Sequence, residues 1–260
     1  MSEVSLDFLH GLSEEDRLFA RRCADRVRAA EEKYRTGFTF FLTEGQAGIA
    51  RSVAGAFGFG RAMLWGGYEG AERVMLGCFS EYDEPSEESF PIRALTVSCG
   101  RQAAITHRDV LGSLMGLDIA RETVGDILVG EDKCIIFLTD TAAEEVLRGL
   151  TKIGRTGVKT ALGADLTQLP EKEFKKITGT VSSLRADCVL SLAARIPRAK
   201  AEQLISQGLM TVRGQTVTKG SGKLAEGDSF SARGYGKFVL ETIGGNTKKD
   251  RIFIDIKKFV

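Results

Sequence analysis

The chain has almost none of the residues from which most catalytic and metal centres are built. Its 260 residues include only two histidines, His10 and His107, so a histidine-based catalytic triad or a zinc site has very little material. Five cysteines are spread along the chain: Cys23, Cys78, Cys99, Cys134 and Cys188. They form no Cys-x-x-Cys pair and are odd in number, which argues against a zinc ribbon and against a disulfide framework. We therefore expect reduced thiols, no metal, no cofactor and no catalytic residue.

The sequence also lacks long apolar segments. No apolar run approaches the ~20 residues that a membrane-spanning helix needs. The first residues, MSEVSLDFLHGLSEEDR, lack the basic segment followed by an apolar one that marks a secretion signal. Hydrophobic residues make up 43% of the chain and charged residues 27%, a composition typical of a globular protein. We expect a cytoplasmic protein with a core of its own and no membrane partner.

The net charge of +1 conceals an uneven distribution. Residues 181–260 contain 14 lysines and arginines against 7 aspartates and glutamates, which gives that segment a net charge of +7. The 180 residues before it contain 22 basic and 28 acidic residues and carry −6. A basic end on a mildly acidic body is typical of a module that binds a polyanion such as nucleic acid, whereas a merely uneven surface is the alternative.

The pattern of apolar residues predicts an α+β protein in three parts. Residues 1–80 predict a small N-terminal α/β region, with a helix within 5–34 and a strand over GFTFFLT at 37–43. Residues 90–168 show the order β-α-β-β-α-β, which predicts a ferredoxin-like or RRM-like domain. The elements of this middle domain are expected at 92–99, 106–117, 126–130, 133–139, 141–153 and 158–166. A linking helix over LPEKEFKKIT (169–178) then leads to a basic domain at 181–260.

The stretch RADCVLSLAARIPRAKAEQLISQGLMTVRG (185–214) combines apolar stripes at helical spacing with several cations. We expect one helix over about residues 187–194, and a second over about 198–207 after Pro197, which cannot continue the first. Gly208 suits the left-handed residue that ends a helix. The alternation that follows predicts two short strands with a turn at Gly214.

Cations from these separate elements are expected to share one face. Arg195, Arg198 and Lys200 lie where the first helix ends and the second begins, and Gln203 extends that face. The N-terminus of a helix adds partial positive charge at the same place. The full candidate set for RNA contact is Arg185, Arg195, Arg198, Lys200, Gln203, Arg213, Lys219, Arg233 and Lys237. Cations that converge from several elements suit a folded nucleic-acid backbone, although any single one could be a solvated surface charge.

The same stretch resembles an S4 domain, an RNA-binding module of the αL type. The motif residues are R-x-D-x-x-L, a basic pair that opens a helix, A-x-x-L-I-x-x-G-x-x-x-V-x-G, L-x-x-G-D and R-G-x-G-x-F, which together cover about 184–239. The chain departs from that family at Pro197, where Ser is usual, and at Ala186, where Leu is usual. The resemblance implies that Arg185, Arg198, Lys200, Gln203 and Arg213 contact RNA. It leaves Asp187 to orient Arg185 or to cap the helix.

Most of residues 35–240 also resemble the YlmH-like family of bacterial S4 proteins. The segments GGYEGAERVMLGCF, HRDVLGSLMGLDIARETVGDILV and the final R-G-x-G-x-F carry this similarity. In that family an RRM-like region precedes the S4 domain. The resemblance implies binding to rRNA of the large ribosomal subunit and a role in ribosome-associated quality control of stalled peptidyl-tRNA complexes. It implies tRNA or peptidyl-tRNA, and protein partners of that process, as further contacts.

The expected RRM-like sheet lacks the pair of aromatic residues with which an RRM binds bases. Its central strand, KCIIFLT, offers Phe137 alone, whereas base stacking in an RRM uses an aromatic pair. We therefore do not expect this sheet to bind single-stranded bases in the usual way. A second RNA or partner surface near the first helix of the domain is the alternative, formed by Arg101, His107, Arg108 and Arg121. The domain could equally act as a spacer or contact another protein.

Three short motifs imitate enzyme signatures and fail in detail. HRD at 107–109 resembles a kinase catalytic loop, but Leu114 stands where the metal-binding Asn is needed. GFGRAM at 58–63 begins a dinucleotide fingerprint whose third glycine would fall at Met63. RAD at 185–187 resembles the R-L-D of pseudouridine synthases, but here it lies at the start of the S4 helix and suits a structural use.

The sequence thus favours a non-enzymatic RNA-binding protein. One alternative is an RNA-modifying enzyme, of the pseudouridine synthase or methyltransferase type, whose catalytic domain is residues 1–170. Binding of S-adenosylmethionine, or base conversion in rRNA, would identify it. The other alternative is a protein adaptor linked to cell division, in which the S4 domain is secondary.

Overall fold

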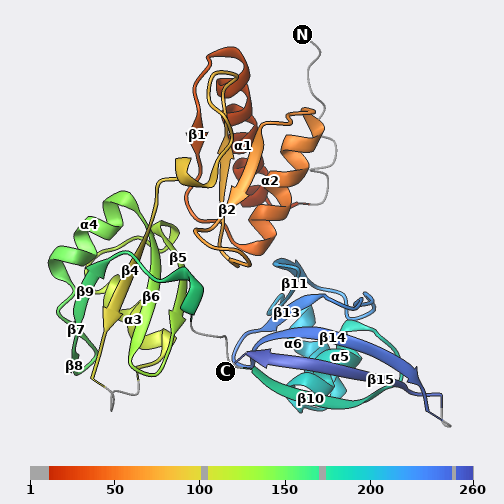
Figure 1. Cartoon of the computed structure of the whole chain (residues 1–260). Coiled ribbons are helices and arrows are strands. Elements are labelled where there is room, and N and C mark those ends of the chain that lie inside the picture. The colour runs from red at the N-terminus through yellow and green to blue at the C-terminus, as the bar shows by residue number, and fades with distance from the viewer. Residues whose placement is uncertain (1–11, 101–104, 170–173, 248–249, 260) are drawn as a thin grey trace. The chain divides into compact units, whose positions relative to one another are not determined.

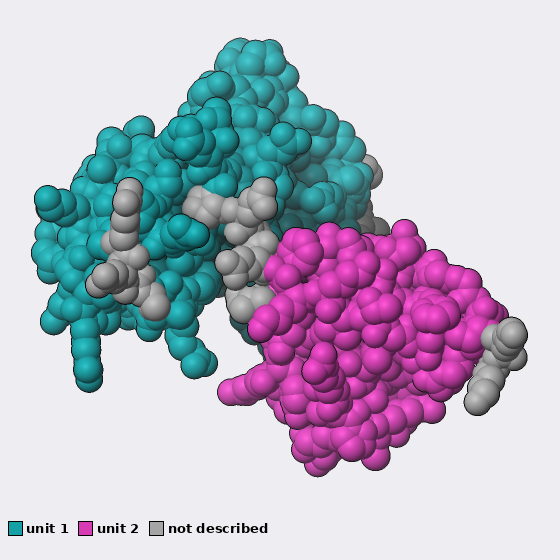
Figure 2. All heavy atoms as spheres, turned by 60° about the horizontal axis from the view of Figure 1, so that its bottom comes forward, with its two compact units in different colours: residues 1–171 teal, residues 172–260 magenta. Residues whose placement is uncertain are grey.

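The computed structural model (Figure 1) describes residues 12–100, 105–169, 174–247 and 250–259. The chain divides into two compact units, residues 1–171 and residues 172–260, which Figure 2 distinguishes by colour. No helix within the described ranges is long and apolar enough to cross a membrane. Residues 1–171 are called unit 1, and residues 172–260 are called unit 2.

Unit 1 begins with two helices on a small antiparallel sheet whose strand order is β1-β3-β2. The elements are α1 (Glu14–Glu32), β1 (Gly37–Phe38), α2 (Glu44–Ala56), β2 (Ala62–Trp65) and β3 (Met75–Cys78). Ser13 caps α1, and a capping box of Thr43 and Gln46 begins α2. Alanines and aliphatic side chains of both helices pack on β3, for example Ala24 and Val53. Small side chains let the two helices approach each other closely.

One expectation for this part is confirmed, and one needs correction. The helix expected within 5–34 begins at Glu14, and residues 5–11 lie outside the described ranges. The strand expected over 37–43 forms a continuous ladder only at Gly37 and Phe38, and Leu42 adds an isolated bridge to Val74. The ladder ends after Phe38 because the hydroxyl of Thr39 accepts the N–H of Leu76 at 2.8 Å, a bond that a strand carbonyl would otherwise make.

The second part of unit 1 has the expected order of strands and helices. Its four-stranded antiparallel sheet has the order β5-β6-β4-β9, with the first and third strands of the domain at its centre. The elements are β4 (Ile92–Ser98), α3 (His107–Met115), β5 (Val124–Val129), β6 (Lys133–Thr139), α4 (Asp140–Gly149) and β9 (Lys159–Leu162). Thr106 and Asp109 form the capping box of α3. The predicted ferredoxin-like or RRM-like fold is confirmed.

Short elements complete unit 1. A small hairpin of β7 (Lys152–Ile153) and β8 (Thr156–Gly157) lies between α4 and β9. The single-turn helices are η2 (Glu87–Ser89), η3 (Arg121–Thr123) and η4 (Leu166–Gln168).

The two faces of β6 belong to two different cores. Cys134, Ile136 and Leu138 point toward α3 and α4 and form the core under these helices. Ile135 and Phe137 point the other way, into a second core whose remaining members come mostly from the N-terminal part. The sheet face on which an RRM would stack bases is therefore covered within unit 1. The division of this unit into domains 1–80 and 90–168 stays a prediction.

A buried carboxylate ties the two parts of unit 1 together. Asp126 on β5 accepts the Tyr68 hydroxyl at 2.6 Å and the backbone N–H groups of Glu72 and Arg73 at 2.9 and 3.0 Å. Burial, and the hydrogen bond to Asp126, raise the pKa of Tyr68 above its ordinary range, so the phenol keeps its proton. The segment GGYEGAER, part of the sequence similarity noted above, is thus held by the fold.

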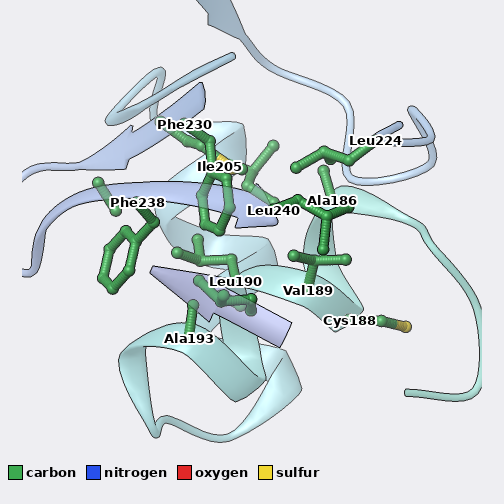
Figure 3. Packing of buried hydrophobic residues seen from close by; sticks show 14 of the residues in the cluster. Ala186, Cys188, Val189, Leu190, Ala193, Ile205, Leu224, Phe230, Phe238 and Leu240 are labelled. Carbon is green, nitrogen blue, oxygen red and sulfur yellow. The ribbon is translucent and has the colours of Figure 1, made fainter. Parts of the chain in front are cut away.

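Unit 2 combines two helices with one antiparallel sheet of strand order β10-β15-β14-β13-β11-β12. The helices are α5 (Ala186–Ala194) and α6 (Arg198–Ser206). The strands are β10 (Phe174–Val181), β11 (Met210–Val212), β12 (Gln215–Val217), β13 (Ser229–Ala232), β14 (Gly236–Asn246) and β15 (Ile252–Phe259). Val189, Leu190 and Ile205 from the helices meet Phe230 and Phe238 from the sheet in one core (Figure 3).

The helix predicted over residues 169–178 is wrong. Residues 170–173 lie outside the described ranges, and Phe174–Val181 form β10, an edge strand paired with β15 from Phe174↔Phe259 to Val181↔Ile252. The charges of EKEFKKIT resemble a solvated helix, but lysines also suit an exposed edge strand. Gly179 makes close packing possible here, because a Cβ at this position would lie 2.7 Å from the Leu192 side chain of α5. In the C-terminal tail, Ile252, Ile254 and Ile256 alternate along β15.

Candidate nucleic-acid interface

A buried carboxylate lies at the start of α5 and binds two arginines. Asp187 is 0% exposed and accepts the backbone N–H of Cys188 at 2.8 Å. Arg185, the residue before the helix, donates Nε to Oδ1 at 3.1 Å and Nη2 to Oδ2 at 2.8 Å. Arg198, the first residue of α6, donates Nε and Nη2 to the same Oδ2 at 3.2 and 2.8 Å. One carboxylate thereby fixes two guanidinium groups that are eleven and two residues away in sequence.

The charge of Asp187 is maintained despite its burial. Burial by itself raises the pKa of a carboxyl group, but the hydrogen bonds from Arg185, Arg198 and Cys188 outweigh it and hold the pKa of Asp187 well below its usual range. The same hydrogen bonds raise the pKa values of both arginines. Their side chains remain 35% and 52% exposed, so both guanidinium groups reach the surface. The expectation that Asp187 orients Arg185 is confirmed, and Arg198 is oriented as well.

Arg195 and Arg213 occupy backbone conformations that favour glycine. Their φ angles are 54° and 50°, in the left-handed region where a side chain costs about 1–2 kcal/mol. Arg195 ends α5, and its N–H and that of Ile196 bond back to Leu192 and Ser191. Within the described residues the exposed guanidinium of Arg195 makes no hydrogen bond or ion pair. Large cations in such positions indicate a use beyond folding.

The other candidates of the helix pair and the first hairpin are exposed. Lys200 donates Nζ to the Gln203 side chain at 3.1 Å, one turn further along α6. Arg213, at the turn between β11 and β12, donates Nε to the buried Asp228. Asp228 also accepts the N–H of Ala225 at 2.8 Å, so this second carboxylate fixes a loop and a cation together.

The loop after β12 reaches the N-terminus of α5. The N–H of Asp187 donates to Gly220 at 3.3 Å, which positions the exposed Lys219 beside the two arginines. Lys223 forms an isolated bridge with Arg185 and is exposed as well. The sequence analysis missed Lys223, because only the return of this loop to α5 brings it near the site.

The two remaining candidates of unit 2 lie on the C-terminal hairpin. Arg233 is exposed in the turn between β13 and β14, and its N–H donates to Leu209 at 2.9 Å. Lys237 is half-buried on β14, with Nζ 5.7 Å from the ring centre of Phe259. The hydrogen bonds described for Asp187 come from Arg185, Cys188 and Arg198, whereas Arg233 and Lys237 lie on a different hairpin.

The second predicted surface is only partly supported by the geometry. Arg101 lies outside the described residues. His107 and Arg108 begin α3 and are exposed, and Arg108 lines a hollow of about 470 Å³ beside Lys152. Arg121 is directed into the fold, where it donates Nη1 to the Val124 carbonyl at 2.7 Å. Burial lowers its pKa, and we correct its assignment: it is a half-buried structural arginine.

Among the described residues there is no group of three or more His, Cys, Asp or Glu side chains that could hold a metal ion.

Comparisons with known proteins agree with this architecture. Residues 85–164 match the family described as "Putative RNA-binding domain in YlmH". The chain is 34% identical over 248 residues to the ribosome-associated protein quality control protein P2 of Bacillus subtilis (strain 168), covering 94% of this chain and 96% of that protein. The solved structure of the cell division protein ylmH from Streptococcus pneumoniae superposes with a TM-score of 0.52 and 23% identity. The matched region covers 59% of this chain and 93% of the Streptococcus pneumoniae chain, and the match shows a similar fold.

Proposed function

This chain belongs to the YlmH-like family, and we propose that it is a ribosome-associated RNA-binding protein. More specifically, we propose that unit 2 binds structured rRNA or tRNA on the large ribosomal subunit. We further propose a role in the quality control of stalled peptidyl-tRNA complexes, together with other proteins of that process. The relative from Bacillus subtilis carries ribosome-associated quality control in its name, and it aligns with nearly the whole chain.

The cluster of Arg185, Asp187 and Arg198 carries this proposal. Exposed guanidinium groups held in fixed orientations by a buried carboxylate lose little conformational entropy when they bind a phosphate. The N-terminus of α6 adds its partial charge next to Arg198. Lys200, Gln203, Arg213 and Lys219 extend the surface with further cations and hydrogen-bond donors. Such contacts suit the phosphates and 2′-hydroxyls of folded RNA, which offers little access to its base edges.

Sucrose-gradient sedimentation of a cell lysate tests the proposal. The wild-type protein should sediment with the large subunit, and Arg185→Ala/Arg198→Ala should remain at the top of the gradient. That variant leaves Asp187 buried without a cation, so Arg185→Ala/Asp187→Asn/Arg198→Ala serves as a second version without an unpaired carboxylate. Arg21→Ala/Arg22→Ala removes two exposed arginines of α1 and is the matched control. Wild-type protein that stays at the top would contradict the ribosome proposal.

The predicted surface at α3 is proposed as a second contact. Because Phe137 and its sheet face are covered, RNA or a partner would meet the matched domain elsewhere, and Arg108 and Lys152 line the hollow beside α3. Arg108→Ala should lower the amount of protein on the large subunit without displacing it fully. Equal amounts of variant and wild-type protein on the subunit would remove Arg108 from the interface.

We propose that the chain acts by binding and not by catalysis. The test is incubation of wild-type protein with rRNA and S-adenosylmethionine, followed by nucleoside analysis. Transfer of a methyl group, or conversion of uridine to pseudouridine, would favour the RNA-modifying alternative. The adaptor alternative predicts that a chain lacking residues 181–260 keeps its cellular role.

A further inference from the structure

A hollow of about 480 Å³ lies on unit 2 where the edge strand β10 meets α5. Its lining comes from the consecutive segment between β10 and the start of α6 and, from more than 50 residues later, Arg251. The lining residues are Thr180, Val181, Ser182, Cys188, Ser191, Leu192, Arg195, Ile196, Arg198 and Arg251. Arg198 also belongs to the cluster at Asp187, so the hollow adjoins the proposed RNA surface.

The chemistry of this lining is that of an anion site. Arg195, Arg198 and Arg251 contribute three positive charges, and no acidic residue is among the described residues that line the hollow. Hydroxyl groups come from Ser182 and Ser191, although the Ser191 hydroxyl donates to the Ile196 carbonyl at 2.6 Å. Unit 2 does contain eight acidic residues. None of them is among the described residues that line the hollow, and Asp187 neutralises part of the charge of Arg198.

Arg251 is held rigidly at the rim. It precedes β15 and donates Nε to the Thr180 hydroxyl at 2.9 Å and Nη2 to the Thr180 carbonyl at 2.6 Å. A guanidinium group has five N–H donors in a planar fork, and these bonds use two of them. Its side chain is exposed, so the remaining donors and the charge are available to a ligand. Arg251 lies beyond residues 184–239, the part of the chain that resembles an S4 domain.

We propose that this hollow binds a phosphate of the RNA backbone, with Arg251 and Arg195 as its principal ligands. This inference rests on the proposed function and extends the RNA footprint from the helix pair across the sheet edge formed by β10 and β15. A volume of about 480 Å³ is larger than a phosphate group. A planar guanidinium group can donate hydrogen bonds to two phosphate oxygens at once. This two-point contact fixes the direction in which the RNA strand leaves the helix pair.

The test measures binding of the full-length protein to purified bacterial large ribosomal subunits over a range of KCl concentrations. Each lost phosphate contact should reduce the slope of log affinity against log salt by about 0.7–0.9. Arg251→Ala should therefore bind about five- to eightfold more weakly at 0.1 M KCl, a difference that disappears near 1 M. Arg251→Lys keeps the positive charge but loses the planar group that the two hydrogen bonds to Thr180 orient. It should keep most of the salt dependence of binding and have reduced affinity.

The matched control is Lys175→Ala, which removes an exposed cation of β10 outside the hollow. It should keep the wild-type slope, and thermal melting should show that all variants are folded. If Arg251→Ala has the wild-type slope while Arg185→Ala/Arg198→Ala is weakened, the hollow is not a phosphate site although the proposed function stands. If wild-type protein does not bind the subunit, both proposals are overturned.

Discussion

Arg198 donates two hydrogen bonds to one oxygen of Asp187, from Nε at 3.2 Å and from Nη2 at 2.8 Å. The acceptor is 0% exposed and the donor side chain is 52% exposed. The pair therefore neutralises part of a positive charge that the protein presents to solvent. This arrangement lowers the net positive charge of the surface but fixes the guanidinium group in one orientation. We infer that this orientation matters more for binding than the total charge.

The first prediction separates orientation from charge. Asp187→Asn adds one positive charge to the surface, yet it should weaken RNA binding, because Arg185 and Arg198 lose the acceptor that fixes them. Folding stability should fall by about 1–3 kcal/mol, since hydrogen bonds to a charged partner are lost. Filter binding to large-subunit rRNA and chemical denaturation measure the two effects. Tighter binding by Asp187→Asn would mean that net charge governs the interaction.

The same carboxylate gives unit 2 a specific sensitivity to acid. The pKa of Asp187 is lower in the folded protein than in the unfolded chain, where a carboxyl titrates near ~3.9. Its contribution is complete above that value and is lost as the pH falls from about 4 toward the lower folded pKa. Denaturation curves between pH 6 and pH 2 should show a smaller acid-induced loss for Asp187→Asn than for wild type. Parallel curves would contradict the assignment.

Arg195 provides a prediction in which stability and binding change in opposite senses. Arg195→Gly relieves a left-handed backbone conformation, which stabilises the folded state by about 1 kcal/mol, and makes the unfolded chain more flexible by a similar or smaller amount. Stability should therefore be unchanged or slightly higher. RNA affinity should fall, since a cation of the proposed phosphate hollow is lost.

Arg213→Gly is the informative comparison for Arg195→Gly. Arg213 has a similar φ of 50°, but it also binds the buried Asp228, so its replacement should lower stability. Thermal melting distinguishes the two variants directly. A large destabilisation by Arg195→Gly would show that its side chain is needed for folding, contrary to the proposal.

Local signals in the sequence were sufficient for the helix pair of unit 2. Pro197 separates the helices, and Gly208 has the left-handed φ of 69° expected after α6. The turn predicted at Gly214 is likewise present between β11 and β12. Each of these features depends on the residue itself and its immediate neighbours, which a single sequence displays fully.

What the sequence could not reveal depends on partners distant along the chain. The segment Phe174–Val181 is a strand because β15, more than 70 residues later, pairs with it. Asp187 holds Arg198 because the left-handed turn at Arg195 brings α6 back to the start of α5. Arg121 turned out to be structural, since only the packed fold shows the Val124 carbonyl that it meets. In the same way, the sequence alone does not place Arg251 at the hollow, because its position there depends on its hydrogen bonds to Thr180.

The covered face of β6 leads to a further prediction. Phe137 is 1% exposed and stacks on Tyr68, with ring centres 4.8 Å apart. Phe137→Leu should destabilise unit 1 by about 1–2 kcal/mol through lost stacking and imperfect packing, and should leave RNA binding unchanged. If Phe137 stacked on a base, its loss would cost about 1–3 kcal/mol of binding. Unfolding curves and filter binding of the same protein preparation decide between these outcomes.

The cysteines predict a simple labelling pattern. Burial raises the pKa of Cys23 to about 12, of Cys78 to about 11 and of Cys134 to about 12, so these thiols carry almost no reactive thiolate at neutral pH. Cys188 is buried as well, whereas Cys99 is half-buried and more accessible. Native protein treated with a thiol-specific chromogenic disulfide at pH 8 should show one rapid phase of a single thiol. Cys99→Ser should abolish that phase, and in guanidinium chloride all five thiols of the wild type should react. A rapid phase that persists in Cys99→Ser would come from Cys188, which lines the hollow of unit 2, or from local opening of the fold around another buried thiol.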